Sequence, residues 1–230
     1  MKDFITVKAI LFDMDGLVLD TEKLYTRFWQ EAAQVCGYPM TKEQALGMRS
    51  LNRGAGLAKM QSYFGLEVDY DGIRRKRIEL MDAFVEKEGV TVKPGIHELL
   101  SYLKEQGIKT SIATSSPIER TILYLTSVGL QNSFDALVSG YMVEKGKPEP
   151  DIYVYAAKNL GVEPSSCMVL EDSPAGILAA HRAGCIPVMI PDQDEPDEAT
   201  RQLLYAKVER LDKVIELLST EHLDTFLPYT

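Results

Sequence analysis

The chain has 230 residues, of which 45% are hydrophobic and 26% are charged, and its formal net charge is −9. This length allows one hydrophobic core, or one core with a smaller lobe. The acidic balance argues against broad binding of nucleic acids or anionic membranes, which favour a basic protein surface. No apolar stretch approaches the roughly 20 residues of a membrane span. Three irregularly spaced cysteines and the absence of a signal peptide lead us to expect a cytoplasmic protein.

The first predicted strand covers residues 8–12 and ends at two acids, Asp13 and Asp15. Ligands of open α/β sheets bind beyond the carboxyl ends of the strands. Two neighbouring carboxylates at such a place repel each other unless a proton or a cation intervenes. A divalent metal with oxygen ligands, most simply Mg²⁺, resolves this conflict and indicates phosphoryl chemistry.

Residues 21–87 show no convincing strand pattern and have helical periodicity instead. Leu24, Phe28, Ala32 and Val35 fall on one face of a first helix, and Thr41 marks the start of a second. A later helix covers about residues 73–85 and contains a basic cluster at 74–77, which we expect to be a solvated helix face. This stretch interrupts the sheet after its first strand, as a cap that opens and closes over a site does.

From residue 94 onward, β and α patterns alternate, which predicts a parallel sheet with helices on both faces. The expected strands lie near residues 109–113, 136–139, 167–170 and 186–190. The expected helices lie near 96–106, 118–128, 151–160, 175–183, 197–206 and 211–218. The predicted fold class is α/β: a Rossmann-like three-layer α/β/α core of residues 1–16 and 91–230, with an inserted α-helical cap domain of residues 17–90.

Polar residues follow three of the later strands. Thr114 and Ser115 come after the strand near 109–113, Lys147 follows the strand near 136–139, and Glu171 and Asp172 follow the strand near 167–170. The carboxyl ends of parallel strands meet at one edge of a sheet. We therefore expect a hydroxyl group, a lysine and two further carboxylates beside the first acid pair.

Four sequence motifs in this order carry a resemblance to a known family. They are Asp13-Met14-Asp15-Gly16-Leu17, Ala113-Thr114-Ser115-Ser116, Gly146-Lys147-Pro148-Glu149-Pro150-Asp151, and Glu171-Asp172-Ser173-Pro174-Ala175-Gly176-Ile177. The chain resembles the haloacid dehalogenase superfamily of phosphohydrolases. Within it, the chain is similar to the branch with a helical cap after the first strand, which includes β-phosphoglucomutase and small sugar-phosphate phosphatases.

The resemblance implies a role for each acid. Asp13 is expected to be the nucleophile that forms an aspartyl-phosphate, and Asp15 the general acid and base. The expected Mg²⁺ ligands are Asp13, Asp15 through its backbone carbonyl, Asp172, and Glu171 directly or through water.

The resemblance also implies the groups that bind the phosphoryl group. Thr114 is expected to donate a hydrogen bond to a phosphoryl oxygen with help from the Ser115 amide, and Lys147 to neutralise both Asp13 and the phosphoryl group. Arg49, in the inserted segment, is a candidate for contact with the substrate, because members of this branch often direct cap side chains into the site.

Several activities fit these motifs. The first is a phosphatase that hydrolyses a small sugar or nucleoside monophosphate. The second is a phosphomutase, although β-phosphoglucomutase has a histidine in the segment after the acid pair and residues 20–25 here have none. A more distant alternative is a receiver-like signalling domain, which lacks a large insertion. We expect a monomer that acts on a small phosphorylated metabolite and binds neither nucleic acid nor membrane.

Overall fold

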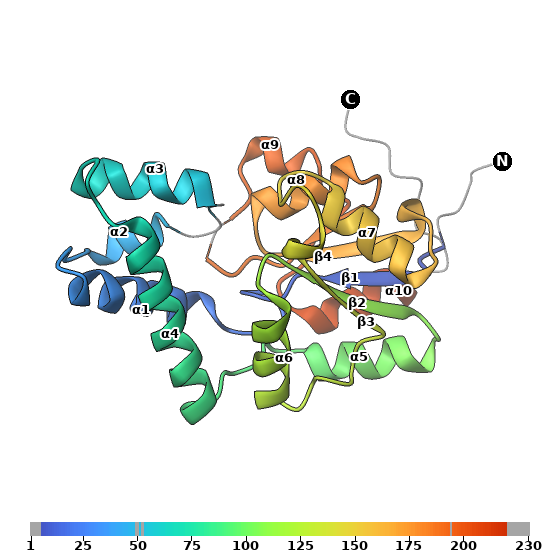
Figure 1. The fold of residues 1–230 in the computed structure, drawn as a ribbon. Helices are drawn as coiled ribbons and strands as arrows, with labels where there is room; N and C mark the ends of the chain where they lie inside the picture. Colours follow the sequence, from blue (N-terminus) through green and yellow to red (C-terminus); the bar gives the residue numbers. More distant parts are fainter. Residues whose placement is uncertain (1–5, 49–50, 52, 194, 220–230) are drawn as a thin grey trace. The chain divides into compact units, whose positions relative to one another are not determined.

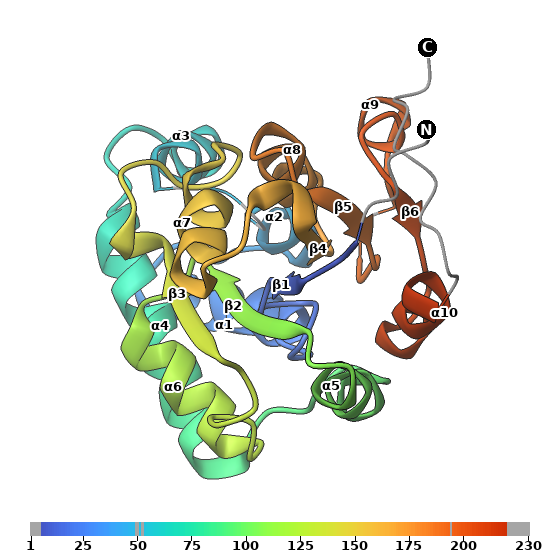
Figure 2. The same ribbon diagram turned by 90° about the vertical axis from the view of Figure 1, so that its right-hand side faces the viewer.

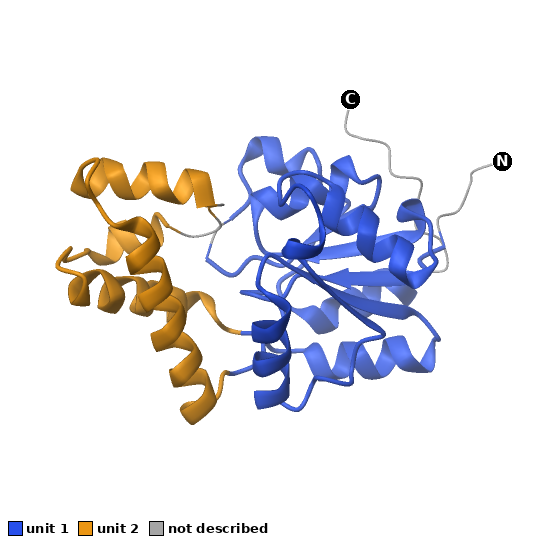
Figure 3. Cartoon of the chain, in the orientation of Figure 1, with its two compact units in different colours: residues 1–19, 91–230 blue, residues 20–90 orange. Residues whose placement is uncertain are grey.

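In the computed structural model, residues 6–48, 51, 53–193 and 195–219 are described. The chain forms two compact units (Figure 3). The core unit consists of residues 1–19 and 91–230, and the helical unit consists of residues 20–90. None of the described helices is both long enough and apolar enough to cross a membrane.

The core unit is built on one parallel sheet of six strands (Figure 1). In chain order these are β1 (Ala9–Phe12), β2 (Lys109–Thr114), β3 (Ala136–Ser139), β4 (Cys167–Glu171), β5 (Ile186–Met189) and β6 (Ala206–Lys207). Their order across the sheet is β3-β2-β1-β4-β5-β6, with β1 in the middle. Phe12 is in register with Ile112 on β2 and Leu170 on β4. The residues that follow these three positions therefore reach the same level of one sheet edge.

Helices cover both faces of the sheet, and Figure 2 shows α7 and α8 on the side opposite α5 and α10. The helices are α5 (Ile96–Glu105), α6 (Ile118–Ser127), α7 (Asp151–Leu160), α8 (Pro174–Arg182), α9 (Glu198–Arg201) and α10 (Val214–Ser219). Short 3₁₀ turns cover Gly140–Met142, Pro164–Ser166 and Leu211–Lys213. β1 and β4 are completely buried, as strands covered on both faces must be. The predicted α/β fold with a parallel sheet between two helical layers is confirmed.

One predicted element is wrong. Residues 197–206 do not form a single helix: α9 ends at Arg201 and the chain then adds strand β6 beside β5. The backbone N–H of Tyr205 donates to the carbonyl of Pro187 at 2.8 Å, and that of Val208 donates to the carbonyl of Met189 at 3.0 Å. Pairing with the open edge of β5 therefore replaces the last helical turns, while Leu204 packs into a small cluster with Ile177 and Met189.

The helical unit contains α1 (Glu22–Val35), α2 (Lys42–Leu46), α3 (Arg53–Phe64) and α4 (Tyr70–Glu88), and its described part contains no strand. The helix expected to start at Thr41 does so. The Gln44 N–H donates to the Thr41 hydroxyl at 3.2 Å, and the Thr41 N–H donates to the Gln44 side chain at 2.9 Å. This reciprocal pair satisfies two N–H groups that the helix start leaves open.

One helix face in this unit is only partly buried, and one expectation for the unit is wrong in detail. Val35, at the end of α1, is 65% exposed, whereas Phe28 and Ala32 on the same predicted face are buried. Within the basic cluster, Arg77 is only 6% exposed and is not solvated. Its guanidinium carbon lies 4.8 Å from the ring centroid of Tyr25 and 5.0 Å from that of Trp29. Packing of α4 against α1 thus places this cation on aromatic faces, where it is attracted to the ring electrons.

Candidate active site

Strand β1 delivers the first acid pair to the carboxyl edge of the sheet. The backbone N–H of Asp13 donates to the carbonyl of Leu170 on β4 at 3.0 Å, so the chain stays paired one residue beyond the strand. Gly16 then has a φ of +84°, in the left-handed region that favours glycine. The chain turns there, and the Gly16 N–H donates to the carbonyl of Leu19 at 2.9 Å. The turn leaves both acids at the sheet edge.

Lys147 joins three groups of this edge. Its Nζ donates to Oδ1 of Asp13 at 2.5 Å, to Oε1 of Glu171 at 2.6 Å and to the carbonyl of Ala113 at 3.1 Å. An ammonium group has three N–H donors, and all of them are used. Burial alone would lower the pKa of Lys147, but the carboxylates of Asp13 and Glu171 outweigh it and hold that pKa above its ordinary value. Lys147 is therefore a permanent cation at the centre of the site.

Burial is the main influence on the pKa of the Asp13 carboxyl group in the metal-free protein. Burial raises the pKa of Asp13 from 3.8 to about 7, Lys147 opposes the rise, and the negative charges of Glu171 and Asp15 add to it. One lysine thus faces more carboxylates than it can neutralise. A bound cation would favour the ionised form of Asp13, which is the form able to act as a nucleophile.

Glu171 is fully buried at the end of β4, and donors surround both of its carboxylate oxygens. Oε1 accepts from Lys147 and, at 2.5 Å, from the hydroxyl of Tyr153. Oε2 accepts from the Ser173 hydroxyl at 3.0 Å, the Asp172 N–H at 3.2 Å and the Ser173 N–H at 3.3 Å. A Cβ on Gly176 would lie 1.8 Å from Oε1, so only glycine leaves room for this carboxylate. These bonds compensate the cost of burying the charge.

Three of the carboxylates are close enough to share a cation. Asp13, Glu171 and Asp172 each offer one oxygen atom, and these atoms all lie within 4.8 Å of one another. An all-oxygen set of carboxylates is what Mg²⁺ and Ca²⁺ prefer. The excess of negative charge around Asp13 also fits a divalent cation. The residues therefore suit a hard divalent metal.

The side chain of Asp15 is held by the segment that follows β2. Oδ2 of Asp15 accepts from the Ser116 hydroxyl at 3.0 Å and from the Thr114 hydroxyl at 3.5 Å. The Ser116 N–H donates to the Thr114 hydroxyl oxygen at 3.1 Å, and the hydroxyl of Ser139 donates to the Ser116 carbonyl at 2.7 Å. The loop is thus locked from β3, and it fixes the orientation of one Asp15 oxygen.

Several site residues expected from sequence come together, and two were missed. Asp13, Lys147 and Glu171 form one bonded group, and Asp172 adjoins it. Thr114 contacts Asp15, while Ser115 is exposed beside it. Arg49 lies outside the described residues.

The missed residues are Ser116 and Tyr153. Ser116 stands next to Ser115 in its motif, and Tyr153 stands six positions after Lys147, on the first turn of α7. The sequence places each of them near a motif residue, which makes it a candidate site residue. The sequence spacing does not show which side chain each one contacts.

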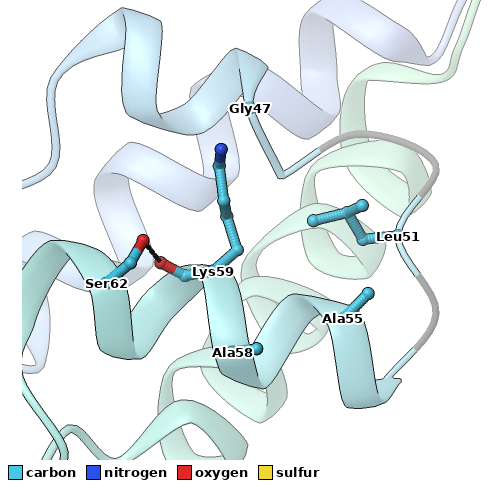
Figure 4. Close-up of a pocket in the computed structure, with 6 residues that line it drawn as sticks. All are labelled: Gly47, Leu51, Ala55, Ala58, Lys59 and Ser62. Atoms are coloured by element: carbon cyan, nitrogen blue, oxygen red, sulfur yellow. Dashed lines mark hydrogen bonds between the residues drawn. The ribbon is translucent and has the colours of Figure 1, made fainter.

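The helical unit has a surface hollow of 480 Å³ along α3, lined by Gly47, Leu51, Ala55, Ala58, Lys59 and Ser62 (Figure 4). The Ser62 hydroxyl donates to the carbonyl of Lys59 at 2.6 Å, and the Lys59 ammonium lies 5.5 Å from the ring centroid of Tyr63. The small residues create the space, and Lys59 is the charged group among the described lining residues. The lining residues that the structure describes can therefore admit a small or anionic group, and they include no carboxyl group.

Comparisons with known proteins identify the family of this chain. A family model described as haloacid dehalogenase-like hydrolase matches residues 7–184. The phosphorylated carbohydrates phosphatase of Thermotoga maritima is 32% identical over 178 residues, covering 77% of this chain and 82% of that protein. The β-phosphoglucomutase of Bacillus subtilis is 30% identical over 188 residues, covering 79% and 82%. The crystal structure of CbbY from Rhodobacter sphaeroides in complex with phosphate is 26% identical, covers 91% of this chain and 96% of that chain, and has a TM-score of 0.77.

Proposed function

This chain belongs to the haloacid dehalogenase-like hydrolases, in the branch of β-phosphoglucomutase and the sugar-phosphate phosphatases, and we propose that it is a Mg²⁺-dependent phosphatase of small phosphorylated metabolites. The observation that carries the proposal is the buried group formed by Asp13, Lys147 and Glu171, with Asp172 beside it. It joins a nucleophile, a fixed cation and metal ligands at the edge of one sheet. Asp13, Asp172 and the Asp15 carbonyl would hold a resident Mg²⁺, with Glu171 as a direct or water-mediated ligand. This cation would offset the repulsion between an anionic nucleophile and a phosphate monoester.

In the first half of the reaction, an oxygen of Asp13 attacks phosphorus while the bond from phosphorus to the ester oxygen breaks. Asp15 donates its proton to the leaving oxygen, so the metabolite departs as a neutral alcohol. Lys147 neutralises charge on Asp13 and on the phosphoryl group, because its ammonium group already lies at Oδ1 of Asp13. The Thr114 hydroxyl and the Ser115 amide bind phosphoryl oxygens. Asp13 then carries an aspartyl-phosphate.

In the second half, Asp15 acts as a base. It takes a proton from water as the water oxygen attacks phosphorus, and the bond between phosphorus and Asp13 breaks. Inorganic phosphate leaves, and both acids return to their starting states. The bonds from Ser116 and Thr114 to Asp15 support this role, because a group that transfers a proton twice must keep its orientation through both steps.

The proposed substrate is a sugar or nucleoside monophosphate, and the helical unit is proposed to act as the cap domain that selects it. The activities of two relatives support a small phosphorylated compound: one is a phosphorylated carbohydrates phosphatase and the other a β-phosphoglucomutase. Arg49 is proposed to contact the anionic substrate from this unit. The expected cytoplasmic location is compatible with the three cysteines, each of which is a free thiol.

The test is release of inorganic phosphate from a panel of sugar and nucleoside monophosphates, with Mg²⁺ and with a chelator. We expect release that needs Mg²⁺ and disappears in Asp13→Asn, whereas Glu98→Gln, an exposed change of the same type on α5, keeps the wild-type rate. Interconversion of sugar phosphates primed by a bisphosphate, without net release, would assign a phosphomutase instead.

A second pair of variants tests the role of Arg49. Arg49→Ala should raise KM for the best substrate of the panel, while Arg53→Ala, which removes a cation that pairs with Asp71 on the surface, should not. An unchanged KM in Arg49→Ala would exclude Arg49 from substrate binding.

A further inference from the structure

Tyr153 contacts the group formed by Asp13, Lys147 and Glu171, although it belongs to none of the four sequence motifs. It lies on the first turn of α7 and is completely buried. Its hydroxyl donates to Oε1 of Glu171 at 2.5 Å, and its ring centroid lies 5.1 Å from Nζ of Lys147. One side chain thus contacts both the carboxylate and the cation of the site, through its hydroxyl and its ring respectively.

The bonds of Lys147 and Glu171 show what the hydroxyl controls. Nζ of Lys147 is shared between Oδ1 of Asp13 and Oε1 of Glu171, at 2.5 and 2.6 Å. Both carboxylates attract the same ammonium group. The Tyr153 hydroxyl takes part of the acceptor capacity of Oε1, which weakens the attraction of Glu171 for Lys147. The Oε2 side of Glu171 is held separately by Asp172 and Ser173, so this competition concerns Oε1.

We propose that Tyr153 is a positioning residue for the reaction, and that its hydroxyl keeps the ammonium group of Lys147 on Asp13 by occupying Oε1 of Glu171. This inference rests on the proposed function insofar as Lys147 neutralises the nucleophile and the phosphoryl group. Without the hydroxyl, Oε1 has Lys147 as its remaining side-chain donor, and Lys147 shifts towards Glu171. The nucleophile and the phosphoryl group then lose part of their neutralising charge in the transition state.

The kinetic test compares two identical substitutions on one helix. Tyr153→Phe removes the buried hydroxyl and keeps the ring, while Tyr155→Phe removes an exposed hydroxyl two residues further along α7. With the best substrate of the panel, we expect kcat of Tyr153→Phe to fall about tenfold, the rate equivalent of one charge-assisted hydrogen bond. KM should change by less than about twofold, because the loss falls on the transition state. Tyr155→Phe should match the wild type, and an unchanged kcat in Tyr153→Phe would overturn the proposal.

A double-mutant cycle separates positioning from general damage to the fold. Tyr153 is inferred to act through Glu171, so adding Tyr153→Phe to Glu171→Gln should lower kcat much less than it lowers kcat of the wild type. Independent, multiplicative losses in the double variant would contradict the proposal.

A crystal structure of metal-free Tyr153→Phe tests the same inference without any turnover. We expect the distance between Nζ of Lys147 and Oδ1 of Asp13 to lengthen beyond that of the wild type, while Nζ stays bonded to Glu171. An unchanged Lys147 would overturn the positioning role. If the wild type releases no phosphate from any compound, the proposed function fails, and this distance still decides the role of Tyr153.

Discussion

Nζ of Lys147 lies 2.5 Å from Oδ1 of Asp13, although 134 positions separate the two residues in sequence. The contact arises because β1 ends at Phe12, directly before Asp13, in the middle of the sheet, while Lys147 reaches the same edge from the loop between β3 and α7. Sheet order rather than local sequence therefore assembles the pair.

The stability of the metal-free protein should depend on pH through Asp13. Burial raises the pKa of this carboxyl group to about 7 in the folded protein, against an ordinary value of 3.8. A carboxyl whose pKa is raised by folding stabilises the fold while it is protonated. Its contribution is therefore present below about pH 4 and is lost as the pH rises through about 7.

Urea denaturation with a chelator, at about pH 5 and about pH 8, measures this effect. We expect the wild type to lose more stability between the two pH values than Asp13→Asn, whose amide does not titrate. The same pH dependence in both proteins would show that Asp13 ionises at its ordinary pKa in the folded state.

Ser116→Ala should impair the proton transfers assigned to Asp15. The substitution removes the 3.0 Å bond to Oδ2 of Asp15 and leaves the longer bond from Thr114. We expect kcat/KM with a sugar phosphate, which reports the steps up to transfer of the phosphoryl group to Asp13, to fall about fivefold, which corresponds to one hydrogen bond. p-Nitrophenyl phosphate should be affected less, because its leaving group needs little protonation. Ser101→Ala, exposed on α5, is the control, and an equal loss on both substrates would argue against a role through Asp15.

Arg77 should stabilise the helical unit by packing. It is buried on the rings of Tyr25 and Trp29, while Arg75 on the same helix is exposed. We expect Arg77→Ala to lower the free energy of unfolding by about 2 kcal/mol, the value of a desolvated cation–π contact, and Arg75→Ala to have little effect. Chemical denaturation of the two variants gives the comparison. Equal stabilities would mean that Arg77 contributes no more than a surface cation.

Breaking the ion pair between Lys93 and Asp192 by removing one partner should destabilise the protein, whereas replacing both partners by apolar residues should have a small effect on stability. Nζ of Lys93 lies 2.5 Å from Oδ1 of Asp192, and both side chains are largely buried. Oδ2 of Asp192 is buried without a hydrogen-bond partner among the described residues. Lys93→Met would leave the carboxylate charge of Asp192 uncompensated and should destabilise the protein by about 2 kcal/mol. The loss is moderate because Lys93 keeps some contact with solvent. The double variant Lys93→Met/Asp192→Leu should recover most of the loss, and a double variant no more stable than Lys93→Met would contradict this.

The parallel sheet and its strand ends were predictable because their signals are local. Apolar runs and the polar residues after them place Asp13, Thr114 and Glu171 at strand ends, and a parallel sheet brings such ends to one edge. The missed features depend on contacts between distant segments. The edge of β5 converts part of a predicted helix into β6, and the packing of α1 on α4 buries Arg77. No local pattern encodes either contact.

The sequence pattern also could not predict which side chains contact each other within the site. The motifs indicate which residues stand at the sheet edge, but not that Ser116 rather than Ser115 contacts Asp15. They likewise do not indicate that Tyr153 bonds Glu171, because that contact depends on how α7 packs against the sheet. The role of Arg49 stays a prediction.

Trapping the proposed covalent intermediate on Asp13 would test the proposed mechanism directly. The enzyme would be mixed with its best substrate and Mg²⁺, quenched in acid during turnover, and reduced with borohydride, which converts an aspartyl-phosphate into homoserine. Peptide mass spectrometry then locates the changed residue. We expect homoserine at position 13, with both the homoserine and the turnover absent from Asp13→Asn. Turnover without a modified residue, or a label at another carboxylate, would contradict the assignment of Asp13 as the nucleophile.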